Sequence, residues 1–178
     1  MSVFDSLVRT TLPITPKPML HFFARRYVAG SRLEDAVATV KRLAQQRCCA
    51  TIDVLGESVT ERQHAVAAVA AYHEVLEAIA ADSLPSHLSL KPTQMGLNID
   101  YSFCRDNIAS VLERAVAKGI FVRIDMEDSP TTDATLRVYH ELIERYPNGT
   151  GVVLQARLRR TLADATALAG AGANVRLC

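Results

Sequence analysis

Polar and charged side chains follow four short apolar stretches of the sequence, at the points where strands of a sheet are predicted to end. In chain order these side chains are Asp53 and Glu57; Lys91, Thr93 and Gln94; Asp125, Glu127 and Asp128; and Gln155, Arg157, Arg159 and Arg160. The carboxyl ends of parallel strands meet at one side of a sheet or one mouth of a barrel, where binding sites gather. Four polar strand ends in succession therefore predict functional groups that face one pocket.

Three of these groups suggest particular chemistry. Lys91 could capture an anionic group of a substrate or form a Schiff base, although a solvated loop cation is the alternative. Asp125 lies between two apolar residues, so its carboxylate needs a partner, which a cation from a neighbouring strand end could supply. Gln155 offers a donor and an acceptor, which would suit an amide-like ring edge or a neighbouring strand end.

Metal and nucleotide sites have weaker signals. The carboxylates of the run 125–128 could bind a divalent metal, but that spacing is common in loops. The four cysteines show no C-x-x-C spacing, so reduced thiols rather than a zinc site are expected. Neither the G-x-G-x-x-G nor the P-loop fingerprint is present.

Strand and helix signals alternate from residue 31 onward. Strands are predicted at 50–55, 87–90, 120–126, 152–155 and 174–177. Helices are predicted before the first strand and between successive strands. Their starts are marked by capping boxes at Ser31-x-x-Glu34, Ser58-x-x-Glu61 and Thr161-x-x-Asp164, and by Ser129-Pro130. Such alternation predicts parallel strands with helical crossovers.

Two α/β architectures fit this pattern. A doubly wound sheet of five strands is one, and a βα (TIM-type) barrel, which needs eight strands and about 250 residues, is the other. The chain stops at an apolar strand, so an incomplete barrel of about five parallel strands is favoured. We expect an N-terminal helical arm at 1–30, with a helix at 19–29, and the first part of the barrel at 31–178.

The composition excludes several classes of protein. The 178 residues are 49% hydrophobic and carry a net charge of +1, which argues against a disordered chain and against nucleic-acid binding driven by bulk charge. Neither a secretory signal nor an apolar run of about 20 residues is present, so a cytoplasmic protein is expected.

The polar strand ends belong to longer runs in which the sequence resembles the proline dehydrogenase family, most closely its short, single-function bacterial form. The runs are Arg25-Arg-Tyr-Val-Ala-Gly30, Asp53-Val-Leu-Gly-Glu57, Leu88-Ser-Leu-Lys-Pro-Thr-Gln-Met-Gly-Leu97, Phe121-Val-Arg-Ile-Asp-Met-Glu-Asp-Ser129, Gly151-Val-Val-Leu-Gln155 and Val175-Arg-Leu177. They come in the family's order and spacing.

The resemblance implies a βα barrel that binds FAD and oxidises L-proline to 1-pyrroline-5-carboxylate. It implies that electrons pass to quinone, with peripheral association with the inner membrane. Lys91 would pair with the substrate carboxylate, and Asp125 would be an active-site residue that holds the basic cluster and the flavin region. Met126 would line the floor of the site, and Gln155 would hydrogen-bond the flavin pyrimidine edge.

The sequence departs from the family pattern at two places. Pro92 follows Lys91, which restricts Lys91 to extended backbone. The chain also stops at Cys178, before the family's Lys-Gly-Ala-Tyr run and its late arginine pair. Compared with the family pattern, the 178-residue chain therefore looks truncated. Alone, it is expected to bind FAD poorly, to show little activity and to aggregate. Two alternatives stay open: a Schiff-base or metal-dependent barrel lyase or aldolase, and a non-catalytic half-barrel that needs a partner.

Overall fold

The structure is a computed structural model that describes residues 29–30 and 32–178. Residues 40–178 form one compact unit, and the described residues before them belong to a separate unit. The predicted helix at 19–29 lies outside the described residues except for Ala29, which is not helical. Ser31, and with it the first predicted capping box, also lies outside them.

Helices and strands alternate along the described chain. They are α3 (Leu33–Gln45), β1 (Ala50–Asp53), α4 (Arg62–Ala81), β2 (Ser86–Leu90), α5 (Tyr101–Ala117), β3 (Val122–Ile124), the 3₁₀ turn η2 (Ser129–Thr131), α6 (Thr132–Ile143), β4 (Thr150–Leu154), α7 (Thr161–Gly170) and β5 (Val175–Leu177). All five predicted strands are therefore confirmed, although β3 is shorter than its prediction of 120–126.

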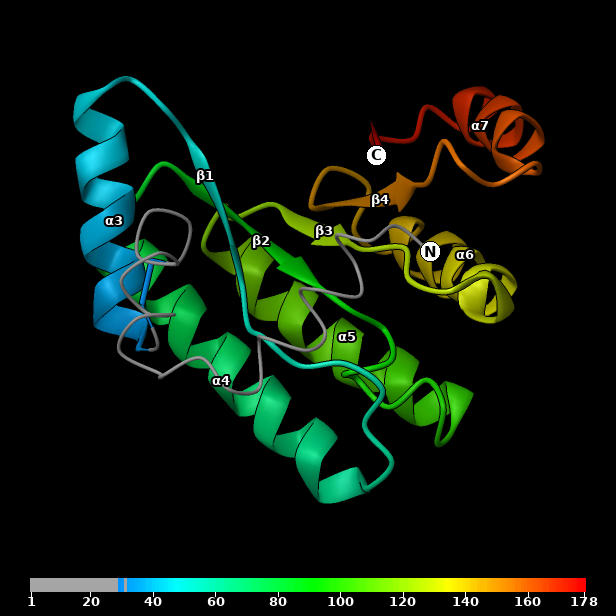
Figure 1. Cartoon of the computed structure of the whole chain (residues 1–178), viewed down its shortest axis with the longest axis horizontal. Helices are drawn as coiled ribbons and strands as arrows, with labels where there is room; N and C mark the ends of the chain where they lie inside the picture. The colour runs from blue at the N-terminus through cyan, green and yellow to red at the C-terminus, as the bar shows by residue number, and fades with distance from the viewer. Residues whose placement is uncertain (1–28, 31) are drawn as a thin grey trace, which may run out of the picture. The chain divides into compact units, whose positions relative to one another are not determined.

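The strands are parallel and lie in chain order, β1-β2-β3-β4-β5 (Figure 1). A doubly wound sheet reverses its strand order at a switch point, whereas a βα barrel adds each strand beside the last. The observed order is that of the barrel, so it rules out the doubly wound alternative for these strands.

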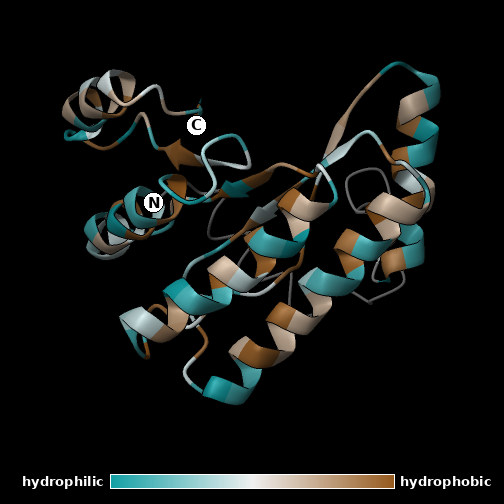
Figure 2. Ribbon diagram, turned by 180° about the vertical axis from the view of Figure 1, so that it is seen from behind, coloured by the Kyte–Doolittle hydropathy of each residue, from teal (hydrophilic) through white to brown (hydrophobic). Residues whose placement is uncertain are grey.

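One face of the sheet is apolar and packs against the helices. Leu88 pairs in register with Ile52 and Val122, and Leu90 pairs with Ile124. Leu88, Leu90, Val122 and Ile124 are fully buried. Helices α4 and α5 pack against each other and carry alternating hydrophobic and hydrophilic stripes (Figure 2). Residues of the other register, among them Asp53, Ser89 and Arg123, therefore share the opposite face.

The predicted capping box at Ser58 is wrong. Helix α4 begins at Arg62, and Glu61 in the N-cap position makes no side-chain cap. Ser58 has a φ of 51°, and its N–H donates to the Thr93 hydroxyl, 2.8 Å away. A contact with the loop after β2 has thus replaced the local cap.

The predicted caps of two other helices also differ from those observed. Helix α7 does begin at Thr161, but Thr161 donates its hydroxyl proton to the Gln155 carbonyl, and Asp164 binds Arg160. Ser129-Pro130 opens the 3₁₀ turn η2, and α6 follows it. Thr161 and Asp164 therefore bind Gln155 and Arg160 and do not form the reciprocal capping box.

Candidate functional site

The polar strand ends converge on one pocket of about 320 Å³ at the carboxyl ends of the strands. Its lining includes all four predicted site residues, which are Lys91, Asp125, Met126 and Gln155. The other lining residues are Glu57, Ser58, Glu127, Asp128, Val153, Arg157, Arg176 and Cys178. Seven of the twelve polar residues predicted at the strand ends thus line one pocket. The other five, which are Asp53, Thr93, Gln94, Arg159 and Arg160, are not among its lining residues.

Strand register explains why these side chains meet. Leu90 pairs with Ile124, and Ile124 pairs with Val152, so one residue further along Lys91, Asp125 and Val153 stand level. Val153 itself pairs with Arg176. Because side chains alternate between faces of a sheet, this row points away from the buried apolar face.

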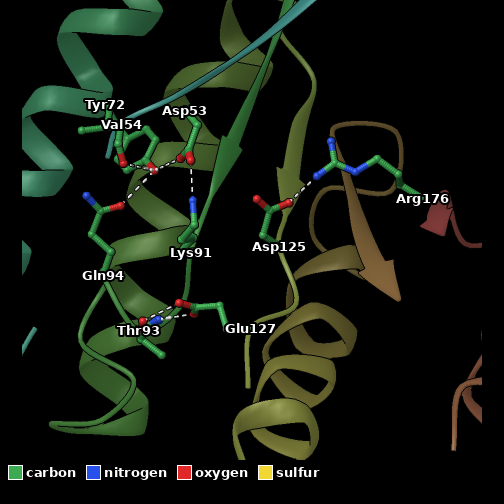
Figure 3. A network of polar contacts seen from close by, with 9 residues as sticks. All are labelled: Asp53, Val54, Tyr72, Lys91, Thr93, Gln94, Asp125, Glu127 and Arg176. Carbon is green, nitrogen blue, oxygen red and sulfur yellow. Dashed lines mark hydrogen bonds and ion pairs between the residues drawn. The ribbon is translucent and has the colours of Figure 1, made fainter. Parts of the chain in front are cut away.

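Lys91 forms an ion pair with Asp53, which lies at the end of β1 (Figure 3). The Lys91 side chain is only 16% exposed and that of Asp53 27%. Burial acts to lower the pKa of Lys91, but the hydrogen bond and charge of Asp53, helped by Asp125 and Glu57, outweigh it and raise the pKa. Lys91 is therefore a fixed cation at neutral pH.

Asp125 pairs with Arg176 of β5, whose Nη2 lies 2.6 Å from Asp125 Oδ1 (Figure 3). Asp125 thus has the expected cationic partner. The partner comes from β5, which is separated from β3 by β4, and not from the end of an adjacent strand. Sequence reasoning placed Arg176 only within a family-like run. The feature of the sequence that could have indicated a role for Arg176 is its position as a charged residue between Val175 and Leu177 in a predicted strand.

The side-chain amide of Gln155 is hydrogen-bonded through its nitrogen but not through its oxygen among the described residues. Its Nε2 donates to the Met126 carbonyl at 3.1 Å. Its Oε1 is buried and has no hydrogen-bond partner among the described residues, and the same holds for Arg176 Nε. Since buried polar atoms are rarely left unpaired, the free oxygen of Gln155 marks a place where a ligand could donate.

Glu127 joins the loops that follow β3 and β2. Its two carboxylate oxygens accept from the N–H of Thr93 at 2.8 Å and from the Thr93 hydroxyl at 2.5 Å (Figure 3). Burial raises the pKa of Glu127, although both bonds from Thr93 act to lower it. Because Thr93 also accepts from Ser58 N–H, three consecutive strand-end loops are tied together.

The geometry of the pocket does not support the metal-dependent or the Schiff-base alternative. Asp125 faces an arginine and Glu127 faces Thr93, and within 29–30 and 32–178 no three His, Cys, Asp or Glu side chains gather so as to hold a metal ion. A Schiff-base lysine needs a lowered pKa, whereas that of Lys91 is raised.

Among the helices of the described residues, none has the length and apolar character that a membrane span requires.

A family model described as proline dehydrogenase matches residues 36–175. The chain belongs to the proline dehydrogenase family. It is 36% identical over 154 residues to proline dehydrogenase 1 of Bacillus subtilis subsp. natto, an alignment that covers 86% of this chain and 51% of that protein. It is 33% identical over 141 residues to proline dehydrogenase 2 of Bacillus subtilis (strain 168), covering 79% and 46%. The chain thus spans about half the length of these curated proline dehydrogenases.

Solved structures show the same fold. Proline utilization A from Bdellovibrio bacteriovorus, inactivated by N-propargylglycine, superposes with a TM-score of 0.77 at 24% identity, over 84% of this chain and 19% of that one. A mutant of Bradyrhizobium japonicum proline utilization A gives a TM-score of 0.64 at 20% identity, over 83% and 17%. The predicted βα-barrel fold of the proline dehydrogenase family is thereby confirmed for the five strands described.

Proposed function

We propose that this chain supplies part of the site at which a flavoenzyme oxidises L-proline to 1-pyrroline-5-carboxylate. The observation that carries the proposal is the meeting of a fixed cation, Lys91, and a buried acceptor, Gln155 Oε1, in the lining of one pocket. Within residues 29–30 and 32–178 this oxygen has no hydrogen-bond donor. A proline oxidase needs both functions, one for the substrate carboxylate and one for the cofactor. Membership of the proline dehydrogenase family supports the same reaction.

The residues of the pocket fit a flavin. The pyrimidine edge of FAD carries an N–H group, and the buried Gln155 Oε1, which has no partner in the described part of the chain, can accept from such a donor. Met126 gives the pocket an apolar lining, and the Asp125–Arg176 pair supplies charge beside it. When bound, FAD would supply the hydride acceptor for the proline ring carbon beside nitrogen.

Lys91 would orient the substrate. Its ammonium carries three N–H groups, and one is used by Asp53. The others have no partner among the described residues and can bind a carboxylate. A charge-assisted bond of this kind fixes the proline ring relative to the cofactor, which is the main contribution that a protein makes to such a reaction.

The electron acceptor and the location belong to the same proposal. We infer a quinone acceptor, and with it a cytoplasmic protein that associates peripherally with the inner membrane. The support for this part is the family resemblance of the sequence runs around Lys91 and Asp125.

Flavin titration tests the proposed cofactor site. Gln155→Leu should weaken FAD binding by about two- to tenfold, because one hydrogen bond is worth about 0.5–1.5 kcal/mol. The matched control is Gln63→Leu, since Gln63 is an exposed residue of α4 that is not among the residues lining the pocket. Equal FAD affinity in the wild type and in Gln155→Leu would contradict the assignment.

A further inference from the structure

Lys91 is the last member of a chain of polar contacts that begins inside the helical layer (Figure 3). We propose that Tyr72 and Asp53 are positioning residues for Lys91: the buried Tyr72 hydroxyl fixes the Asp53 carboxylate, and that carboxylate fixes the Lys91 ammonium. The proposal rests on the proposed function in one respect, that Lys91 is the group that binds the substrate carboxylate.

Tyr72 is the buried end of this chain. It lies on α4 and is fully buried, and its hydroxyl lies 3.0 Å from Asp53 Oδ1, 3.0 Å from Gln94 Oε1 and 3.5 Å from the Val54 carbonyl. Burial, and then the charge of Asp53, raise the pKa of Tyr72. The phenol therefore keeps its proton and remains a donor across the physiological range.

The single proton of Tyr72 can serve only one of these three oxygens. The Asp53 carboxylate is the strongest acceptor because it is charged. A glutamine amide can turn so that its NH₂ faces the phenol, which lets Gln94 donate to Tyr72 while Tyr72 donates to Asp53. In that arrangement each donor has one acceptor, and the direction of every bond is fixed.

Asp53 uses both of its oxygens. Oδ1 faces Tyr72 and Oδ2 faces Lys91, so the carboxylate cannot rotate without breaking one of the two contacts. The other acids that act on Lys91 are Asp125, which Arg176 binds, and Glu57. Asp53 is thus the one carboxylate among these three to which Lys91 is hydrogen-bonded, and Tyr72 sets its orientation.

The test measures the pKa of Lys91 in the absence of any substrate. The rate at which an amine reagent labels Lys91 is followed against pH by mass spectrometry, in wild type, Asp53→Asn, Tyr72→Phe and the double variant. Tyr72→Phe removes one oxygen atom and keeps the buried ring. The matched control is Tyr146→Phe, since Tyr146 is also buried and its hydroxyl has no partner among the described residues.

In Asp53→Asn the pKa of Lys91 should fall from its wild-type value, because burial then acts without its main opposing charge. In Tyr72→Phe it should fall part of the way, and in Tyr146→Phe it should not move. If Tyr72 acts through Asp53, the double variant should match Asp53→Asn alone. An unchanged pKa in Asp53→Asn or in Tyr72→Phe overturns the proposal, as does a double variant whose shift is the sum of the two single shifts.

Failure of the proposed function would look different. L-proline should slow the labelling of Lys91 in the wild type, whereas pyrrolidine, which lacks the carboxylate, should not. If the variants shift the pKa of Lys91 as expected but L-proline gives no protection, Tyr72 and Asp53 still position Lys91. The proposal that Lys91 binds the substrate carboxylate would then be contradicted.

Discussion

Arg176 of β5 pairs in register with Val153 of β4, and its Nη2 lies 2.6 Å from Oδ1 of Asp125, at the end of β3. The two residues are on strands that are not neighbours, so the contact ties the last described strand to the middle of the sheet. Together with Asp53 and Lys91 it makes a row of alternating charges along the carboxyl ends of the strands (Figure 3).

Loss of the arginine should therefore destabilise the sheet. Arg176→Leu leaves Asp125, 18% exposed, without its cation. The expected loss is about 1–2 kcal/mol of unfolding free energy, between the values typical of exposed and of buried pairs. Urea denaturation measures it. Arg137→Leu, which removes an exposed pair with Glu141, is the control, and a loss no larger than in this control would show that the Asp125 contact contributes nothing.

The Thr93 hydroxyl should hold the three strand-end loops together. Thr93→Val keeps the shape of the side chain but leaves Glu127 and the Ser58 N–H each short of a partner. We expect a loss of about 2–3 kcal/mol, because buried groups that lose a hydrogen-bond partner are costly. Thr93→Ser restores the hydroxyl and should recover more than half of that loss. Thermal or urea unfolding that gives Val and Ser the same stability would show that the hydroxyl is not what matters.

Cys104 should make the fold sensitive to alkali. Burial, helped by the charge of Glu127, raises the pKa of its thiol from 9.0 to about 12. The unfolded chain therefore loses this proton at a lower pH than the folded chain does, so stability falls as pH rises above 9. Between pH 8 and pH 10 the thiol accounts for about 1 kcal/mol of that fall.

Urea unfolding at several pH values checks this prediction. Cys104→Ala should flatten the decline in stability between pH 8 and pH 10, whereas Cys48→Ala, at an exposed position, should leave it unchanged. The slope is compared rather than the stability itself, because the alanine also leaves a cavity. An unaltered slope in Cys104→Ala would mean that the thiol ionises equally in the folded and unfolded chains.

The sequence was sufficient to predict the five strands and part of the pocket lining. The alternation of apolar runs gave the five strands, and the rule that strand ends meet brought Lys91, Asp125 and Gln155 together. The capping box at Ser58 failed because its loop is tied to Thr93, a contact between residues 35 positions apart. Such a contact leaves no trace in the local pattern.

Two partners of the site could not be predicted for a similar reason. Tyr72 sits in the apolar stripe of a helix, where a core residue is the ordinary interpretation, and its hydroxyl finds Asp53 only once α4 packs beneath the sheet. Arg176 reaches Asp125 because of strand register, which periodicity alone does not specify.

The most direct test of the central proposal is the anaerobic reduction of FAD by L-proline in the presence of the protein. Flavin is supplied in excess, and a single turnover is enough to register a slow reaction. We predict that L-proline bleaches the flavin absorbance, that pyrrolidine does so poorly, and that Lys91→Met raises the L-proline concentration required by about 10- to 100-fold, the value of a charge-assisted hydrogen bond. Flavin that binds but is not reduced by L-proline, or reduction that is indifferent to Lys91→Met, would contradict it.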